Sequence, residues 1–356
     1  MTTSQLHLFF KVGNVLAIMP QNNTLGKVYT ILIFTLLFAG AIYSTIERNY
    51  DYFFMKNVFL YTNDVIFVCL NFYVTIIITF WKRKQWKMFW EKFNMSYKLT
   101  QTYDNRRDYP FTIFLISHVI FFAVGVYNAC VWYGIEGITM IKKFGIRRME
   151  NYIHFFYSLF LTITLGMLLT RYKKLNTILN SYVTKKLRFY DSTSRKMSYI
   201  VCHLKDTVNI FNDLYGWPLF FIIYQTLLQF LIYLYFMITN EESFEVIVVQ
   251  MSLISITLCM TVSLILTCSK VVQESYKLVS LTYKLRWAVT ENIQKQELYE
   301  FTNLVVVNLP KFTAADFFEI DKNTILQIFA TVNTLLVILI QMGQVNVTSS
   351  HRKIRE

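Results

Sequence analysis

The sequence contains little charge, glycine or proline. Of its 356 residues, 16% are charged, ten are glycine and four are proline. Soluble domains carry about 25% charged residues. A soluble chain that is 54% hydrophobic would expose a large apolar surface, so a lipid bilayer is the expected solvent. The scarcity of Gly and Pro also disfavours transporters with broken helices, which show such interruptions in paired spans.

Groups suited to catalysis or metal binding are also sparse. The five histidines are scattered, and no nucleophile elbow, Gly-rich phosphate loop or H-E-x-x-H sequence occurs. Four of the five cysteines lie in apolar stretches and one lies in a basic loop, so neither a metal site nor an extracellular disulfide is expected. The sequence therefore predicts no enzyme activity, no metal and no cofactor.

Acidic residues are outnumbered, with 22 Asp and Glu against 35 Lys and Arg, a net charge of +13. No basic stretch is organised as a nucleic-acid reading module, so we expect no nucleic-acid partner. Basic residues in membrane proteins collect in cytosolic loops and contact lipid headgroups. The run Trp81-Lys82-Arg83-Lys84 is interpreted as such a lipid-facing anchor.

Seven stretches are long and apolar enough to span a membrane, which takes about 20 residues per helix. The first could be a cleaved signal peptide, but the long segment before it, which contains Phe9 and Phe10, favours a span. The predicted spans cover residues 28–46, 58–80, 111–134, 153–170, 217–239, 244–268 and 324–342.

Lys and Arg are distributed unequally between the two sides. Segment 1–27 and loops 81–110, 171–216 and 269–323 together contain 26, whereas the alternate segments contain nine. The positive-inside rule therefore places the N-terminus and the long loops in the cytosol. With seven spans the tail 343–356 is then extracellular. We predict an all-α polytopic membrane protein with this topology.

The cytosolic loops carry helical patterns. Between the fourth and fifth spans, apolar residues recur at alternating spacings of four and three, which is typical of an amphipathic helix that continues into the membrane: Met197, Val201, Leu204, Val208, Phe211 and Tyr215. Similar patterns extend the fourth and sixth spans, and a separate helix is expected near 294–309. We therefore predict that helices four to six extend into a cytosolic anchor bundle, to which 269–323 contributes.

Seven spans suggest a G-protein-coupled receptor, but the details disagree. The predicted N-terminus is cytosolic, the third span lacks an Asp-Arg-Tyr end, and the seventh lacks Asn-Pro-x-x-Tyr. This class, and a seven-span transporter, are therefore the weaker alternatives.

Two parts of the sequence resemble the insect gustatory receptors. Segment 312–321, FTAADFFEID, precedes a last span in which an apolar run joins Thr334 to Gln341. The family has Gly, Tyr and Phe where this chain has Asp316, Leu335 and Met342. A second segment, NDLYGWPL at 212–219, is similar to the family's Phe-Gly-x-Pro sequence at the start of the fifth span.

The resemblance implies a ligand-gated, non-selective cation channel in the plasma membrane. It implies a homo- or heterotetramer of identical or related subunits, in which the last helix, 324–342, lines the pore and the cytosolic extensions join the subunits. The ligand would be a small-molecule tastant, for which a bitter or plant-derived compound is one hypothesis. A subunit of the related insect odorant receptors is the main alternative, although the short chain and the Phe-Phe-x-Ile-Asp sequence favour taste.

The last span supplies the candidate pore residues. Gln341 is predicted to form a polar ring in the pore, with Ile338 and Met342 as an apolar constriction that gates by excluding water. The alternative for Gln341 is an interhelical hydrogen bond, the usual arrangement of polar residues in membranes.

Asp64 lies within the second span, and intramembrane carboxylates are costly and often functional. It could face a ligand pocket or reach the lipid headgroups. Near the outer ends of other spans, aromatic and amide side chains could form a pocket for a small ligand or an interfacial belt. The candidate ligand-binding residues are Asp64, Tyr127, Asn128, Trp132, Tyr157, Tyr233 and Gln250.

Overall fold

The computed structural model describes residues 3–20, 23–47, 54–101, 110–184, 191–239, 244–289 and 292–353. Within these ranges, seven helical segments are long and apolar enough to cross a membrane, which confirms the predicted all-α, seven-span class. The elements in chain order are α1 (Thr3–Val15), α2 (Thr24–Glu47), α3 (Phe54–Phe72), the π-helix η1 (Tyr73–Trp81), α4 (Arg83–Gln101), α5 (Pro110–Glu136), α6 (Thr139–Thr184), α7 (Asp191–Thr239), α8 (Phe244–Ala288), α9 (Asn292–Val307), β1 (Thr313–Ala314), β2 (Phe318–Glu319) and α10 (Lys322–Lys353).

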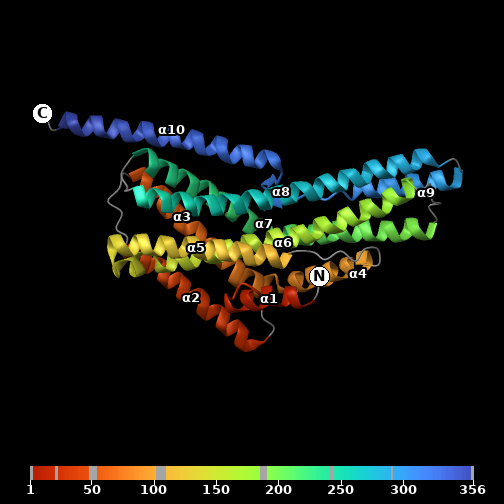
Figure 1. Ribbon diagram of the computed structural model, residues 1–356, viewed down its shortest axis with the longest axis horizontal. Coiled ribbons are helices and arrows are strands. Elements are labelled where there is room, and N and C mark those ends of the chain that lie inside the picture. Colours follow the sequence, from red (N-terminus) through yellow and green to blue (C-terminus); the bar gives the residue numbers. More distant parts are fainter. Residues whose placement is uncertain are drawn as a thin grey trace.

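Three helices are far longer than a bilayer requires. The helices α6, α7 and α8 have 46, 49 and 45 residues. At about 1.5 Å per residue each is roughly 70 Å long, whereas the hydrocarbon core is about 30 Å thick. Figure 1 shows one end of all three beside α9, away from α2, α5 and most of α10. The predicted extension of helices four to six into a bundle beyond the membrane is therefore confirmed.

The extension bundle has an apolar core with a few polar contacts. The six periodic residues that predicted an amphipathic helix, from Met197 to Tyr215, are all at most 4% exposed in α7. Arg171 of α6 donates to the Ser96 hydroxyl at 2.6 Å and lies over the Phe93 ring, 3.6 Å from its centroid. Buried charge of this kind is tolerated because the guanidinium gains both a hydrogen bond and an aromatic face.

Aromatic rings fill the junction between the extension bundle and the spans. Phe9 of α1 packs 4.2 Å from the Phe114 ring of α5, and Phe10 packs 5.1 Å from Trp90 of α4. Trp86 of α4 stacks on Phe160 of α6 at 6.2 Å. Such rings bury a large apolar area. The N-terminal segment therefore includes a helix that packs into the fold.

The helix carrying the fourth span begins earlier than the sequence predicted. The predicted span starts at 153 and its preceding external loop covers 135–152, but α6 starts at Thr139, directly after a turn in which Gly137 has a φ of +60°. The basic residues in 139–152 lower the local hydropathy, so the predicted apolar span begins later in the sequence than the helix does. Arg147 and Glu150 therefore lie on the helix rather than in a loop.

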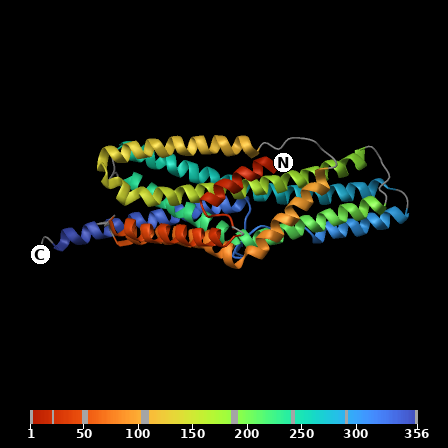
Figure 2. The same ribbon diagram turned by 90° about the horizontal axis from the view of Figure 1, so that it is seen from below.

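Helix α10 runs along the edge of the bundle, and its C-terminal part projects beyond the other helices in both views (Figures 1 and 2). Its main contacts are with α7 and α8. Between Lys322 and Gln341, the buried residues are Thr324, Ile328, Val332 and Leu339, which recur at intervals of one or two turns, and most of the other residues are exposed. One face of α10 is thus held by the chain and the others face outward.

Candidate functional site

An ion cluster joins α3 and α6 among the candidate ligand residues. The Arg147 guanidinium of α6 lies 2.7 Å from the Asp64 carboxylate of α3, and the two side chains are 14% and 13% exposed. Glu150, one turn further along α6, lies 3.8 Å from the same guanidinium. Thr45 of α2 donates to Asp64 at 3.2 Å. Asp64 thus bonds within the protein and holds three helices together.

Aromatic rings surround this cluster. The Arg147 guanidinium lies over Phe67, 4.0 Å from the ring centroid, and Phe67 packs edge-on against His154 at 5.9 Å. Tyr233 of α7 is half-buried. A guanidinium on an aromatic face gains attraction that increases with desolvation. The structure therefore places the predicted ligand residue Asp64, together with Phe67, against one cation.

Buried hydrogen bonds connect the same spans. Gln225 of α7 donates to the Asn63 side chain of α3 at 2.6 Å, and the hydroxyls of Thr226 and Thr261 join α7 to α8 at 2.7 Å. Polar side chains inside a bilayer commonly form such interhelical bonds. These bonds fix how the helices around Arg147 are positioned.

The other candidate ligand residues are distributed more widely. Asn128 is buried and its carbonyl accepts a 3.4 Å bond from Arg148, while Trp132 packs 4.9 Å from Phe144, so both lie at the α5–α6 contact. Tyr157 is 1% exposed and its ring is 6.3 Å from that of Tyr215, deeper in the bundle.

Two further candidates lie nearer the surface, because Tyr127 is 45% exposed and Gln250 is half-buried. The structure therefore places Asp64 against Arg147, Asn128 and Trp132 between α5 and α6, and Tyr157 in the inner core.

Sequence reasoning missed Arg147 and Glu150. Both residues lie in the predicted external loop, and a charged residue in an exposed loop gives no indication of a packing contact. Their spacing of three residues was the available signal, because i and i+3 side chains share a face of a helix. That signal becomes meaningful only once 139–152 is known to be helical.

A polar stripe follows one exposed flank of α10. Gln327, Thr331, Thr334, Ile338 and Gln341 are all exposed and recur at spacings of four, three, four and three residues. This period keeps them on one side of the helix. The stripe includes the predicted pore residues Ile338 and Gln341, whereas the side chain of Met342 lies outside the described residues.

The adjacent face of α10 is different in character. Leu326, Phe329 and Val337 are exposed there and are apolar, and Asn333 is the one exposed amide among them. A helix with one mainly apolar exposed face and one mainly polar exposed face suits a boundary between lipid and water, because polar side chains are costly in hydrocarbon.

The two family-like segments, about 100 residues apart, meet in space. Asn212 of α7 donates to the Lys311 carbonyl at 2.7 Å and accepts from the Thr313 amide at 3.4 Å. A Cβ on Gly216 would lie 3.0 Å from the Ala315 backbone nitrogen. Only glycine lets the α7 backbone approach the β1–β2 hairpin this closely.

The hairpin turn requires an unusual backbone. Ala315 and Asp316 have φ values of 50° and 61°, and the Phe317 amide bonds to the Ala314 carbonyl at 3.0 Å. Positive φ at both central residues defines a type I′ turn, which favours Asn and Gly. Asp316 stands where the resembling family has Gly, and it accepts a 2.8 Å bond from the Thr313 hydroxyl.

The hairpin leads directly into α10 through a helix cap. The Asp321 carboxylate accepts from the Thr324 amide at 3.2 Å, and the Thr324 hydroxyl accepts from the Asp321 amide at 3.2 Å. This reciprocal pair satisfies donors that the first turn leaves unpaired. The Ile-Asp end of segment 312–321 thus starts the last helix.

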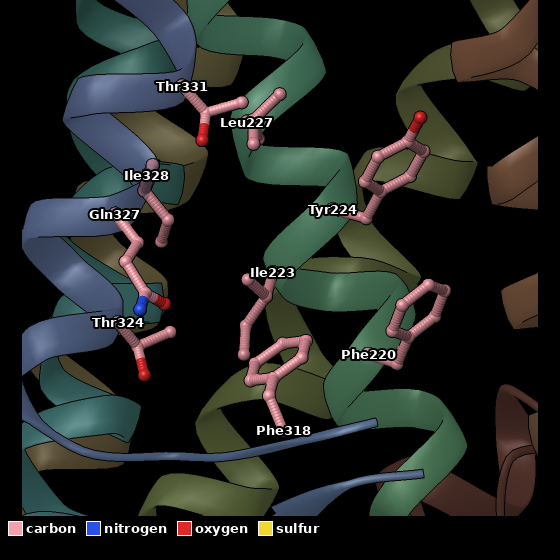
Figure 3. Close-up of a pocket in the computed structure, with 9 residues that line it drawn as sticks. All are labelled: Phe220, Ile223, Tyr224, Leu227, Phe318, Thr324, Gln327, Ile328 and Thr331. Atoms are coloured by element: carbon pink, nitrogen blue, oxygen red, sulfur yellow. The ribbon is translucent and has the colours of Figure 1, made fainter. Parts of the chain in front are cut away.

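A cavity of about 170 Å³ lies between α7 and the first turns of α10. Figure 3 shows Ile223 and Leu227 of α7 opposite the α10 side chains, with Phe318 of β2 at one end. The Phe220 and Tyr224 rings stack along α7 with centroids 6.0 Å apart. Its lining residues are Phe220, Ile223, Tyr224, Leu227, Phe318, Thr324, Gln327, Ile328 and Thr331. Gln327 and Thr331 also belong to the polar stripe.

Comparison with known proteins identifies one matching sequence family and solved structures of similar fold. The sequence profile described as 7tm chemosensory receptor matches residues 8–346. No curated protein sequence matches the chain. Within the part of the chain that the structure describes, no group of His, Cys, Asp and Glu could hold a metal ion.

Two similar solved structures are of the insect olfactory receptor OR5 from Machilis hrabei. The first has a TM-score of 0.63 at 11% sequence identity and covers 95% of this chain and 100% of that chain. The second, a complex with eugenol, has a TM-score of 0.62 at 11% identity with the same coverage. At this identity the similarity shows a shared fold.

Proposed function

The chain belongs to the 7tm chemosensory receptor family, and we propose that it is a gustatory receptor that works as a ligand-gated, non-selective cation channel. The family membership confirms the predicted chemoreceptor class of this multi-pass membrane protein. The proposed receptor is a homo- or heterotetramer in the plasma membrane, with its N-terminus in the cytosol. Each subunit would contribute α10 to a central pore.

The polar stripe on α10 is the observation that carries the channel proposal. Its five members, from Gln327 to Gln341, are exposed in the single chain. If α10 were surrounded by lipid, this flank would place two amides in hydrocarbon at a cost of a few kcal/mol. Several copies arranged around an axis would turn the stripes toward water and leave Leu326, Phe329 and Val337 to contact lipid or a neighbouring subunit. Ile338 would then form the apolar constriction.

We place the agonist among the candidate residues near Arg147. The Machilis hrabei receptor of similar fold was solved with eugenol, a small aromatic molecule. Here Phe67 lies over the guanidinium of the Asp64–Arg147 ion pair, and Tyr233 of α7 is a further candidate, which combines apolar contact with a few polar groups, as small-ligand sites do. A bitter or plant-derived tastant fits this chemistry.

The test is cysteine scanning of α10 during current recording. The exposed Cys130 and Cys259 are first replaced by Ser. Cysteines are then introduced singly at Thr331, Thr334 and Gln341, with matched positions Leu326, Phe329 and Val337 on the apolar face. A water-soluble cationic thiol reagent should change the basal current, or the current evoked by caffeine, at the stripe positions and leave the matched positions unaffected.

Two results would refute the proposal. One is equal modification of cysteines on both faces of α10, which would show that the polar stripe does not line the pore. The other is a caffeine or eugenol response that disappears when G-protein signalling is blocked, because a ligand-gated channel needs no such coupling.

An odorant receptor subunit is the second candidate, since both similar solved structures are of an olfactory receptor. Responses to volatile eugenol but not to water-soluble caffeine would favour it.

A further inference from the structure

The cavity between α7 and α10 lies apart from the proposed agonist site. It adjoins the β1–β2 hairpin through Phe318, whereas Tyr233 lies more than two helical turns further along α7 than Ile223. We propose that this cavity is a second binding site, which takes an uncharged molecule of one aromatic ring with a small hydrogen-bonding group.

The size of the cavity selects the class of ligand. Its volume is about 170 Å³. An engineered apolar cavity of about 150 Å³ holds benzene, whereas drug-sized ligands occupy pockets of roughly 300–1,000 Å³. The space between α7 and α10 therefore suits a single substituted ring.

The lining selects the polarity of the ligand. No lining residue is charged, and Ile223, Leu227 and Ile328 present aliphatic surface across the space (Figure 3). A charged ligand would lose its hydration without gaining a partner. The Gln327 amide on the α10 side can both donate and accept, so a phenol or a similar group can be oriented there. An alkyl chain would satisfy the apolar wall but would leave this amide unused.

The position of the cavity links it to the pore helix. Its walls include Gln327 and Thr331, which are also members of the polar stripe. An occupant would fill the contact between α7 and α10, and would favour whichever arrangement of α10 keeps the cavity open. This expectation rests on the proposed channel function: a molecule bound in the cavity should change the size of the current without replacing the agonist.

Binding is tested on the full-length receptor in phosphatidylcholine nanodiscs. The probe is the small photoreactive aromatic trifluoromethyl-phenyldiazirine, and its attachment sites are mapped by mass spectrometry with and without excess para-cresol. We expect labelled peptides from α7 and α10 around Leu227 and Ile328, with labelling suppressed by para-cresol. Leu227→Trp fills the space and should reduce this labelling at least about tenfold.

Leu326→Trp is the matched control. It introduces the same side chain on the exposed apolar face of α10, where Leu326 is 68% exposed and lines no part of the cavity. Equal labelling in the two variants would overturn the site. So would labelling that oleate suppresses and para-cresol does not, because the occupant would then be a lipid chain. Absence of labelling at these peptides in the assembled receptor would also overturn the site.

The effect on current is measured separately. Para-cresol should change the caffeine-evoked or basal current of the wild type and of Leu326→Trp, and should leave that of Leu227→Trp unchanged. An unchanged wild-type current with normal labelling would overturn the coupling to the pore. A receptor that carries no current under any condition would instead count against the proposed channel, and the labelling experiment would still decide the site.

Discussion

Arg147 and Asp64 form an ion pair that spans α6 and α3, with 2.7 Å between Nη1 and Oδ1. Both side chains are largely buried, and Phe67 covers one face of the guanidinium. The desolvation cost of such a pair is large, so the pair itself contributes little net stability. Removing one partner is a different matter, because the remaining charge is left buried without its counterion.

Asp64→Ala should therefore destabilise the receptor by about 2 kcal/mol, less than for a fully buried pair because Glu150 also lies near Arg147. Unfolding of the purified receptor in denaturant would measure this. Asp206→Ala is the matched control, since the Lys92–Asp206 pair is 29% and 53% exposed and should cost less than about 1 kcal/mol. The double variant Asp64→Asn/Arg147→Gln should recover part of the loss; no recovery would show that the pair is not coupled.

Gly216→Ala should disrupt the contact between α7 and the hairpin. The new Cβ would lie 3.0 Å from the Ala315 nitrogen and 3.3 Å from its Cα, and backbone atoms cannot move aside as a flexible side chain can. Gly166→Ala in α6 is the matched control, because its Cβ would meet nothing within 4 Å. The control should gain up to about 1 kcal/mol from helix propensity, while Gly216→Ala loses stability. The melting temperatures of the purified variants would show this, and equal shifts would contradict it.

Ala315→Gly should stabilise the hairpin by about 1 kcal/mol, because Ala315 has a φ of 50° and glycine adopts this conformation without steric cost. Ala314→Gly in strand β1 is the control and should be destabilising, since Ala314 is fully buried. Asp316→Gly should change stability little, because the relief of backbone strain is offset by losing the bond from Thr313. Protease resistance of the hairpin under mild denaturation reports on all three. A loss of resistance in Ala315→Gly would argue against the type I′ turn.

The orientation of the chain in the membrane is tested with epitope tags. The predicted cytosolic segments contain 26 Lys and Arg against nine in the others, so the N-terminal tag should be protected from antibody on intact cells and the C-terminal tag accessible. Permeabilised cells provide the control for expression of both tags. An N-terminal tag that is accessible on intact cells would contradict the predicted topology and, with it, the proposed arrangement of the pore.

Much of the fold followed from periodicity and hydropathy. The seven spans and the buried stripe from Met197 to Tyr215 are local patterns, because a helix repeats every 3.6 residues and a bilayer demands a fixed apolar length. The helix that carries the fourth span begins at Thr139, before the predicted start of that span, for the same reason. Basic residues between Thr139 and Tyr152 lowered the hydropathy of a segment that is helical in the structure.

The site depended on contacts that no local pattern contains. Asp64 was recognisable as costly in a membrane, but its partner Arg147 lies 83 residues away on another helix. The polar stripe on α10 could be read as a spacing in the sequence, yet only the packing of Thr324, Ile328, Val332 and Leu339 shows that this flank remains exposed.

The sequence by itself thus determined the class, the spans and the family resemblance, since these depend on composition and short-range order. Only the tertiary structure decided that segments 212–219 and 312–321 pack together, that Asp64 bonds to Arg147, and that a cavity lies beside α10. Each of these joins residues distant in the chain, and their proximity is a result of helix packing.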